Sequence, residues 1–184
     1  MLTVKERGHF VATLRYVHVL LMETLAAWVP TTPEVEVKLL FGEHIWDVAQ
    51  HADSLGKRTF ELRLPLQHSV RAADPYVAFL AEVKAIGPTP QRLAAMYDVV
   101  LPGVVRRQRR YLEQTDKLVD APTVRILERY LSDTIRMTEA AHALRRELPA
   151  LDLTDRHWID AHQAREARLE LLAAPAAETV TAGA

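Results

Sequence analysis

Three ionisable side chains, His44, Asp47 and His51, recur at intervals of three and four residues in a stretch with helical periodicity. Because an α-helix turns about 100° per residue, they rise along one side of the helix over about two turns. The two histidines fall within an apolar arc formed by Val37, Leu40, Phe41, Ile45, Val48, Ala52 and Leu55, and Asp47 lies at its edge. Unpartnered polar groups are costly in a protein interior, so these side chains need partners. A bound metal, a hydrogen-bond network or an acid–base pocket would supply them.

A fourth candidate, His18, belongs to the buried arc of the preceding helix, whereas Glu23 falls on its polar side. The turn between the two helices is short, which makes them antiparallel neighbours. Counting back from a turn centred near Thr31, His18 comes level with about His44. We therefore expect His18 to converge with His44, Asp47 and His51 between the first two helices.

Two kinds of chemistry suit this set of side chains. As metal ligands, His18, His44, Asp47 and His51 would suit a single divalent ion such as iron, manganese or zinc. As metal-free catalytic residues, His44, Asp47 and His51 would suit proton transfer, with Asp47 orienting a histidine that acts as acid or base. The cofactor is iron or manganese in the first case and none in the second.

The inner arcs of the later helices supply polar groups that would line the rest of such a pocket. The expected substrate-binding residues are Tyr97, Gln108, Tyr111, Thr134 and Thr138. Hydroxyl and amide groups of this kind orient a small organic substrate by hydrogen bonding. The reaction could be an oxidation, or an elimination, cyclisation or isomerisation, and the sequence leaves these open.

The chain of 184 residues is long enough for one domain with an apolar core, since 49% of it is hydrophobic. Helical periodicity and no extended strand pattern predict an all-α fold. The expected helices cover residues 3–28, 33 to 56 or a little beyond, 75–86, 91–117 with a kink at Pro102-Gly103, 122–148 and 155–172. We expect Thr32, Asp74 and either Asp120 or Ala121 at helix N-caps. Residues 1–172 form a single domain, and residues 173–184 a disordered tail.

Composition excludes several classes of protein. The net charge of −1 gives no reason to expect nucleic acid or an anionic membrane as a partner, and the absence of cysteine excludes disulfides and thiolate chemistry. The most apolar early run, residues 17–29, is interrupted by His18 and Glu23 and is too short to span a bilayer. We expect a cytoplasmic protein with no membrane partner. Trp28 and Trp46 are expected in the core.

A cluster of four arginines, Arg106, Arg107, Arg109 and Arg110, lies mostly outside the inner arc of its helix. Such clusters are typical of a solvated helix face. The alternative is a contact with an anion or with a partner.

Two stretches, FGEHIWDVAQHADSLGKR at residues 41–58 and TDKLVDAPTVRIL at residues 115–127, resemble bacterial ferritin-like domain proteins, which are related to di-iron carboxylate proteins. The resemblance covers roughly residues 8–148. It implies a ferritin-like four-helix bundle with a long crossover between the second and third long helices and an additional C-terminal helix.

The family's metal-ligand set is degenerate in this chain. The family takes carboxylates from two helices and a Glu-x-x-His pair from each of the other two. In this chain the positions expected to carry metal ligands on the fourth long helix are occupied by Thr134 and Met137. The third long helix has the neutral Gln108 as its buried polar residue. On the second, Asp47 and His51 are four residues apart, where the family has three.

The resemblance therefore implies a small-molecule biosynthetic or metabolic enzyme with a polar His/Asp pocket, most simply a metal-dependent oxidoreductase or oxygenase-like protein. One alternative is a metal-free lyase, cyclase or isomerase. Another is a non-catalytic ferritin-like partner subunit, in which the histidines are satisfied core residues. We expect a homodimer, or a complex with a ferritin-like partner subunit.

Overall fold

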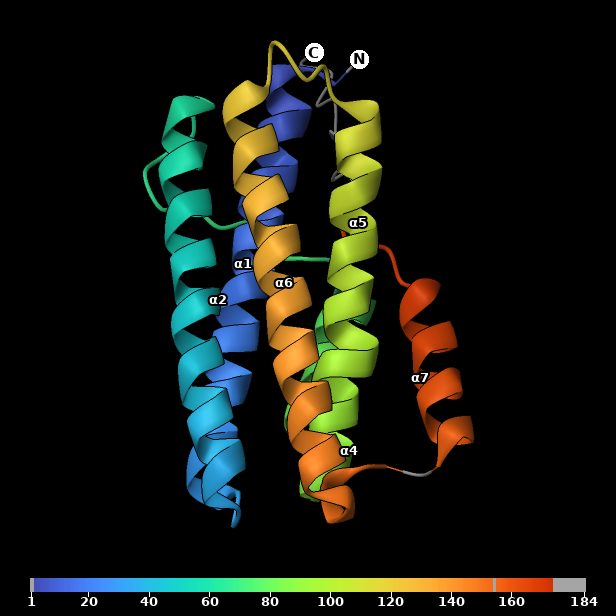
Figure 1. The fold of residues 1–184 in the computed structure, drawn as a ribbon. Coiled ribbons are helices and arrows are strands. Elements are labelled where there is room, and N and C mark those ends of the chain that lie inside the picture. Colours follow the sequence, from blue (N-terminus) through green and yellow to red (C-terminus); the bar gives the residue numbers. More distant parts are fainter. Residues whose placement is uncertain (1, 154, 174–184) are drawn as a thin grey trace, which may run out of the picture.

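The computed structural model describes residues 2–153 and 155–173, and every regular element in these ranges is a helix. The elements are, in order, α1 (Val4–Trp28), η1 (Val29–Thr31), α2 (Val35–Glu61), α3 (Asp74–Lys84), α4 (Thr89–Leu93), η2 (Ala94–Val100), α5 (Leu101–Gln114), α6 (Ala121–Glu147), η3 (Pro149–Leu151) and α7 (Arg156–Ala167). In Figure 1, α1, α2, α5 and α6 lie side by side along a common direction, and α7 lies outside α5. The all-α prediction is confirmed, and most of the predicted tail lies outside the described residues.

The turn between α1 and α2 differs from the prediction in a way that moves the candidate site. Thr32 does not cap α2, which begins at Val35 after Glu34. Instead, the Thr32 hydroxyl donates to the Trp28 carbonyl (2.8 Å) and accepts from Arg92 (3.0 Å). Because residues 29–31 add a 3-10 turn and α2 starts later than expected, the midpoint of the turn moves along the chain. His18 therefore comes level with His51 rather than with His44.

The first helix is also the most apolar. Residues Val4–Thr31 are long and apolar enough to cross a membrane, so the expectation that the early apolar run is too short to span a bilayer is wrong. More than half of the most apolar part of this helix is buried inside the protein, as in the core helix of a helical bundle. The cytoplasmic location and the lack of a membrane partner stay predictions.

A long connection leads from α2 to α4 and contains α3. The indole Nε1 of Trp28 donates to the Lys84 carbonyl (2.9 Å), which fixes the end of α3 against the end of α1. Asp74, predicted as an N-cap, is instead the first residue of α3 and pairs with Arg71 at 3.1 Å. The chain between α2 and α4 thus contains one short helix, and the predicted N-cap of that helix is wrong.

The predicted single helix over residues 91–117 is interrupted before Pro102, not at it. Residues Ala94–Val100 form a π-helix between α4 and α5, and such π segments are rare and occur often at functional sites. Pro102 has no N–H to donate to the carbonyl of Asp98, four residues earlier. Gln163 of α7 donates its side-chain amide to that carbonyl instead (2.8 Å). This bond joins α7 to the π-helix.

The last helix, α7, is shorter than predicted and is held by a buried carboxylate. Glu166 is 1% exposed and forms ion pairs with Arg106 and Arg107 of α5. Arg107 also donates to the Leu169 carbonyl (2.7 Å) and lies over the ring of Tyr76. Two of the four clustered arginines therefore bind α7 rather than facing solvent alone.

At the opposite end of α5, a buried network fixes the start of α6. Asp120, one of the two residues predicted at this N-cap, does precede α6, although its side chain makes no capping bond. Its carboxylate accepts hydrogen bonds from Arg58 (2.9 Å), Tyr111 (2.6 Å), Thr115 (3.0 Å) and Thr123 (2.6 Å). These hydrogen bonds lower the pKa of Asp120 although its burial acts to raise it.

Candidate functional site

His51 lies on α2 against α6 and is the centre of a group of polar side chains in the bundle. Its ring stacks on Tyr130 with centroids 3.9 Å apart, and the Tyr130 hydroxyl donates to the His51 carbonyl (2.7 Å). The Nε2 of His51 is 3.1 Å from a carboxylate oxygen of Asp133. His51 is buried, whereas the Asp133 side chain is 24% exposed. The pair therefore extends from the core to just below the surface.

His18 of α1 lies edge-on to His51, with ring centroids 5.3 Å apart. His18 is 2% exposed, and neither of its ring nitrogens has a hydrogen-bond partner among the described residues. Burial, and to a lesser degree the neighbouring His51, lowers the pKa of His18 well below its usual value. Burial also lowers the pKa of His51, while its hydrogen bond to Asp133 opposes the shift. We therefore expect the His51 ring to have a higher pKa than the His18 ring.

His44 forms a separate pair two turns away on α2. Its Nδ1 is 2.6 Å from the hydroxyl of Tyr97, which belongs to the π-helix. Its Nε2 is buried and has no partner in the described part of the chain. Burial lowers the pKa of His44 to about 4, and burial raises the pKa of Tyr97. Both groups are consequently neutral near pH 7.

Asp47 does not orient a histidine, which corrects the predicted catalytic arrangement. Its carboxylate pairs with Arg136 of α6 at 2.8 Å. Arg136 also approaches Glu43 (3.3 Å) and Asp133 (3.7 Å). The carboxylate that contacts His51 is instead Asp133, because α6 packs beside α2.

The donor geometry does not support the predicted metal site. His18 and His51 contact each other, but His44 faces Tyr97 and Asp47 faces Arg136. Within residues 2–153 and 155–173, no group of three or more histidine, aspartate or glutamate side chains could hold a metal ion. The four expected ligands thus do not form one coordination set.

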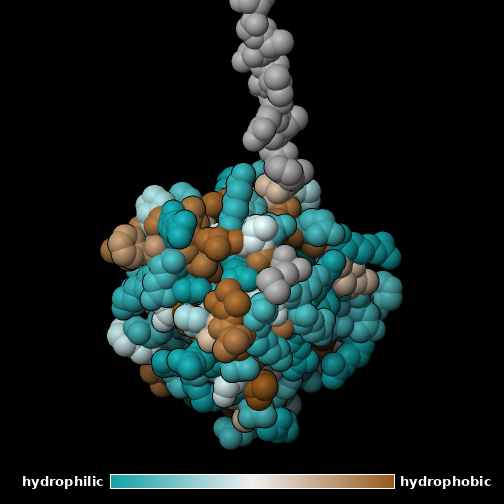
Figure 2. All heavy atoms as spheres, turned by 90° about the horizontal axis from the view of Figure 1, so that it is seen from above, coloured by the Kyte–Doolittle hydropathy of each residue, from teal (hydrophilic) through white to brown (hydrophobic). Residues whose placement is uncertain are grey.

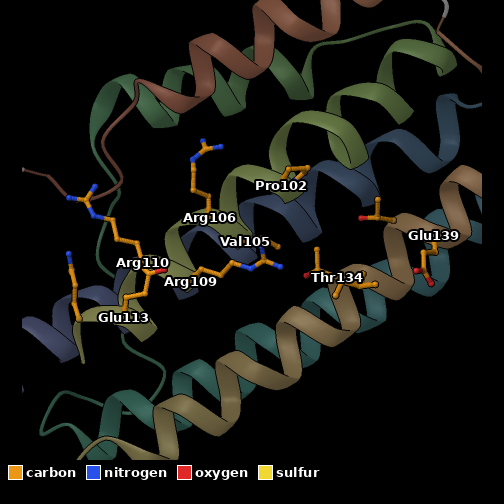
Figure 3. Close-up of a pocket in the computed structure, with 11 residues that line it drawn as sticks. Pro102, Val105, Arg106, Arg109, Arg110, Glu113, Thr134 and Glu139 are labelled. Carbon is orange, nitrogen blue, oxygen red and sulfur yellow. The ribbon is translucent and has the colours of Figure 1, made fainter. Parts of the chain in front are cut away.

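The five expected substrate-binding residues lie in different parts of the bundle and have different partners. Tyr97 bonds to His44, and Tyr111 bonds to Asp120 and stacks on Phe10. Gln108 is fully buried, and neither atom of its amide has a partner among the described residues. Thr134 and Thr138 line an outer groove between α5 and α6 (Figure 3). These residues therefore do not line a common pocket.

Asp133 and Arg136 belong to the site although the sequence pattern did not single them out. Both are polar residues on a long amphipathic helix, and their helical spacing alone gives the pattern of an ordinary exposed ion pair. One signal was available: Asp133 is three residues from the inward-facing Tyr130 and next to Thr134. Only the packing of α6 against α2 identifies His51 as its partner.

No protein-family model matches the chain, and neither a curated protein nor a solved structure matches it.

Proposed function

We propose that this protein is a metal-free enzyme that acts on a small organic molecule by acid–base chemistry at the His51–Asp133 pair. One observation carries the proposal: the buried His18, whose two ring nitrogens have no partner among residues 2–153 and 155–173, lies against a histidine that is bonded to a carboxylate. Buried polar atoms without partners are uncommon in folded proteins, and a catalytic role is one of the explanations for such an atom.

The arrangement divides the chemical roles among the side chains. If Nε2–H of His51 donates to Asp133, Nδ1 keeps the lone pair that accepts a proton from the substrate. Asp133 then stabilises the imidazolium that forms, and the same proton can return to a different substrate atom. His18, which stays neutral, offers hydrogen bonds to the substrate. This chemistry suits an isomerisation, an elimination or a cyclisation.

The second neutral pair, His44 and Tyr97, would contact a more distant part of the substrate. The two histidines of α2 are seven residues apart, or about 10 Å along the helix. A small organic molecule can span that distance. The π-helix supports this assignment, since it is the element that brings Tyr97 to His44.

We also propose that the bundle is of the ferritin-like type with a crossover. Its support is the order of elements: two long helices joined by a short turn, a long connection, and a second long pair. The dispersed donor set is the reason to prefer the metal-free form of the enzyme to an iron- or manganese-dependent oxidoreductase.

The test is conversion of a defined mixture of small metabolites, followed by mass spectrometry of every consumed and formed mass. We expect the wild-type protein to convert at least one compound, with no change in its oxidation state, and the His51→Gln variant to lose that activity. His157→Gln removes an exposed histidine far from the pair and should retain it. Equal conversion by the two variants would contradict the proposal.

A second candidate function is that of a non-catalytic partner subunit, and the outer face of α2 favours it. Val35, Leu39 and Trp46 are 61%, 70% and 67% exposed and fall within a narrow stripe of the helix. Trp46 was predicted in the core, and this prediction is wrong, whereas Trp28 is buried. A Cβ added at Gly42, between Leu39 and Trp46, would meet no other atom, so a second helix could approach closely.

Apolar side chains are also exposed at one end of the bundle. Figure 2 views that end and shows hydrophobic atoms gathered among hydrophilic ones, and Leu118 and Val119 of the α5–α6 connection are 87% and 62% exposed. Large exposed apolar patches mark interaction sites. Sedimentation of the wild type and of Trp46→Glu tests this: a homodimer that the substitution dissociates, without any metabolite conversion, would favour the subunit over the enzyme.

A further inference from the structure

A groove of about 830 Å³ runs between α5 and α6 on the outside of the bundle (Figure 3). Its apolar surface comes from Pro102, Val105 and Ile135, and Ile135 is 50% exposed. Thr134 and Thr138 add hydroxyl groups from α6. Clefts of this size, mostly apolar with a few polar groups, are typical of small-molecule sites.

The α5 side of the groove carries three arginines with different partners. Arg106 is bound to Glu166 of α7. Arg109 and Arg110 form no ion pair with any residue of the described ranges. Figure 3 shows Arg109 extending from α5 toward Thr134 on α6, so its guanidinium is directed across the groove and not away from the protein. A guanidinium in this position is suited to a two-point hydrogen bond with a carboxylate.

Two acidic residues of the groove limit how many negative charges a bound ligand can carry. Glu113 and Glu139 also line the groove and offset the charges of Arg109 and Arg110. A polyanion such as a nucleic acid or a polyphosphate would be repelled by these carboxylates. A ligand with one negative charge and an apolar body avoids this repulsion, because only its charged end needs to lie beside Arg109.

We propose that the α5–α6 groove binds a small organic monocarboxylate. The carboxylate accepts hydrogen bonds from the guanidinium of Arg109 and from the hydroxyl of Thr134, and the apolar body lies over Val105 and Ile135. This site lies on the outside of the bundle and does not depend on chemistry at His51.

The test is isothermal titration of the full chain with three monocarboxylates, namely hexanoate, 4-phenylbutanoate and indole-3-acetate, and with their neutral amides. At least one carboxylate should bind about tenfold more tightly than its amide, since hydrogen bonds to charged groups contribute about 1.5–3 kcal/mol. Arg109→Gln should remove this preference. Arg146→Gln deletes an exposed arginine elsewhere on the surface and should preserve it.

Two further variants keep the result interpretable. Ile135→Asn should weaken the carboxylate and the amide equally, because it changes only the apolar contact. His51→Gln should leave binding in the groove unchanged, which separates this proposal from the proposed catalysis. The proposal is overturned if none of the three carboxylates binds, if acid and amide bind equally, or if Arg109→Gln retains the preference while circular dichroism shows a folded protein.

Discussion

Acidification should destabilise the bundle through His44, and the structure gives the size of the effect. The His44 side chain is fully buried, and its pKa falls from 6.5 to about 4 on folding. Between these values the unfolded chain binds more protons than the folded protein, so stability is full above pH 6.5 and is lost as the pH falls. The free energy of unfolding changes by about 1.36 kcal/mol per pH unit for one such group. Lowering the pH from 6.5 to 5 therefore reduces it by about 2 kcal/mol through His44 alone.

Urea unfolding followed by circular dichroism at pH 7, 6 and 5 measures this loss. The matched variant is His44→Gln, which keeps hydrogen-bonding groups opposite Tyr97 but does not titrate. Comparing the two proteins cancels the contribution of carboxylates that protonate in the same range. The wild type should lose about 2 kcal/mol more than the variant between pH 7 and pH 5. His157→Gln, at an exposed position, should behave as the wild type, and parallel pH dependences for wild type and His44→Gln would refute the reasoning.

Three further substitutions test the packing around the site. A Cβ at Gly103 would overlap the buried Glu166 carboxylate, so Gly103→Ala should lower the free energy of unfolding by about 1–3 kcal/mol. It should also speed hydrogen exchange in α7, and unchanged exchange would count against the packing of α7 on α5 through Glu166. Asp120→Ala removes the buried carboxylate that pairs with Arg58 and leaves the half-exposed Glu61 as the acidic partner of Arg58; it should lower the free energy of unfolding in urea by about 3–5 kcal/mol, against almost nothing for the exposed Asp160→Ala. Asp47→Asn, whose partner Arg136 is half-exposed, should cost about 1 kcal/mol or less and spare metabolite conversion; a lost activity would restore Asp47 as a catalytic residue.

Much of the architecture follows from the sequence because helix ends and apolar arcs are local signals. The first helix ends at Trp28 as expected, Asp120 precedes α6, and Leu40, Phe41 and Leu55 of the predicted apolar arc are buried. The errors arise where a tertiary contact replaces a local one. Thr32 binds Arg92 instead of capping α2.

The candidate site was predicted less well, because it depends on register between helices. The inward direction of His18, His44 and His51 is a property of each helix and is confirmed. Which histidines meet depends on the length of the α1–α2 turn. Because the midpoint of this turn lies further along the chain than predicted, His18 contacts His51 and not His44. The π-helix has no signal in the apolar pattern, so the bond between Tyr97 and His44 could not be foreseen.

The proposal that His51 and Asp133 act as a catalytic pair is tested most directly by a double-substitution cycle on turnover. The rate of metabolite conversion is measured for the wild type, His51→Gln, Asp133→Asn and the double variant, with folding checked by circular dichroism. Residues that act as one unit give non-additive losses. Each single variant should lose about 10²–10⁴-fold, and the double variant should be no slower than His51→Gln. Unchanged rates, or losses that multiply in the double variant, would contradict the proposed pair.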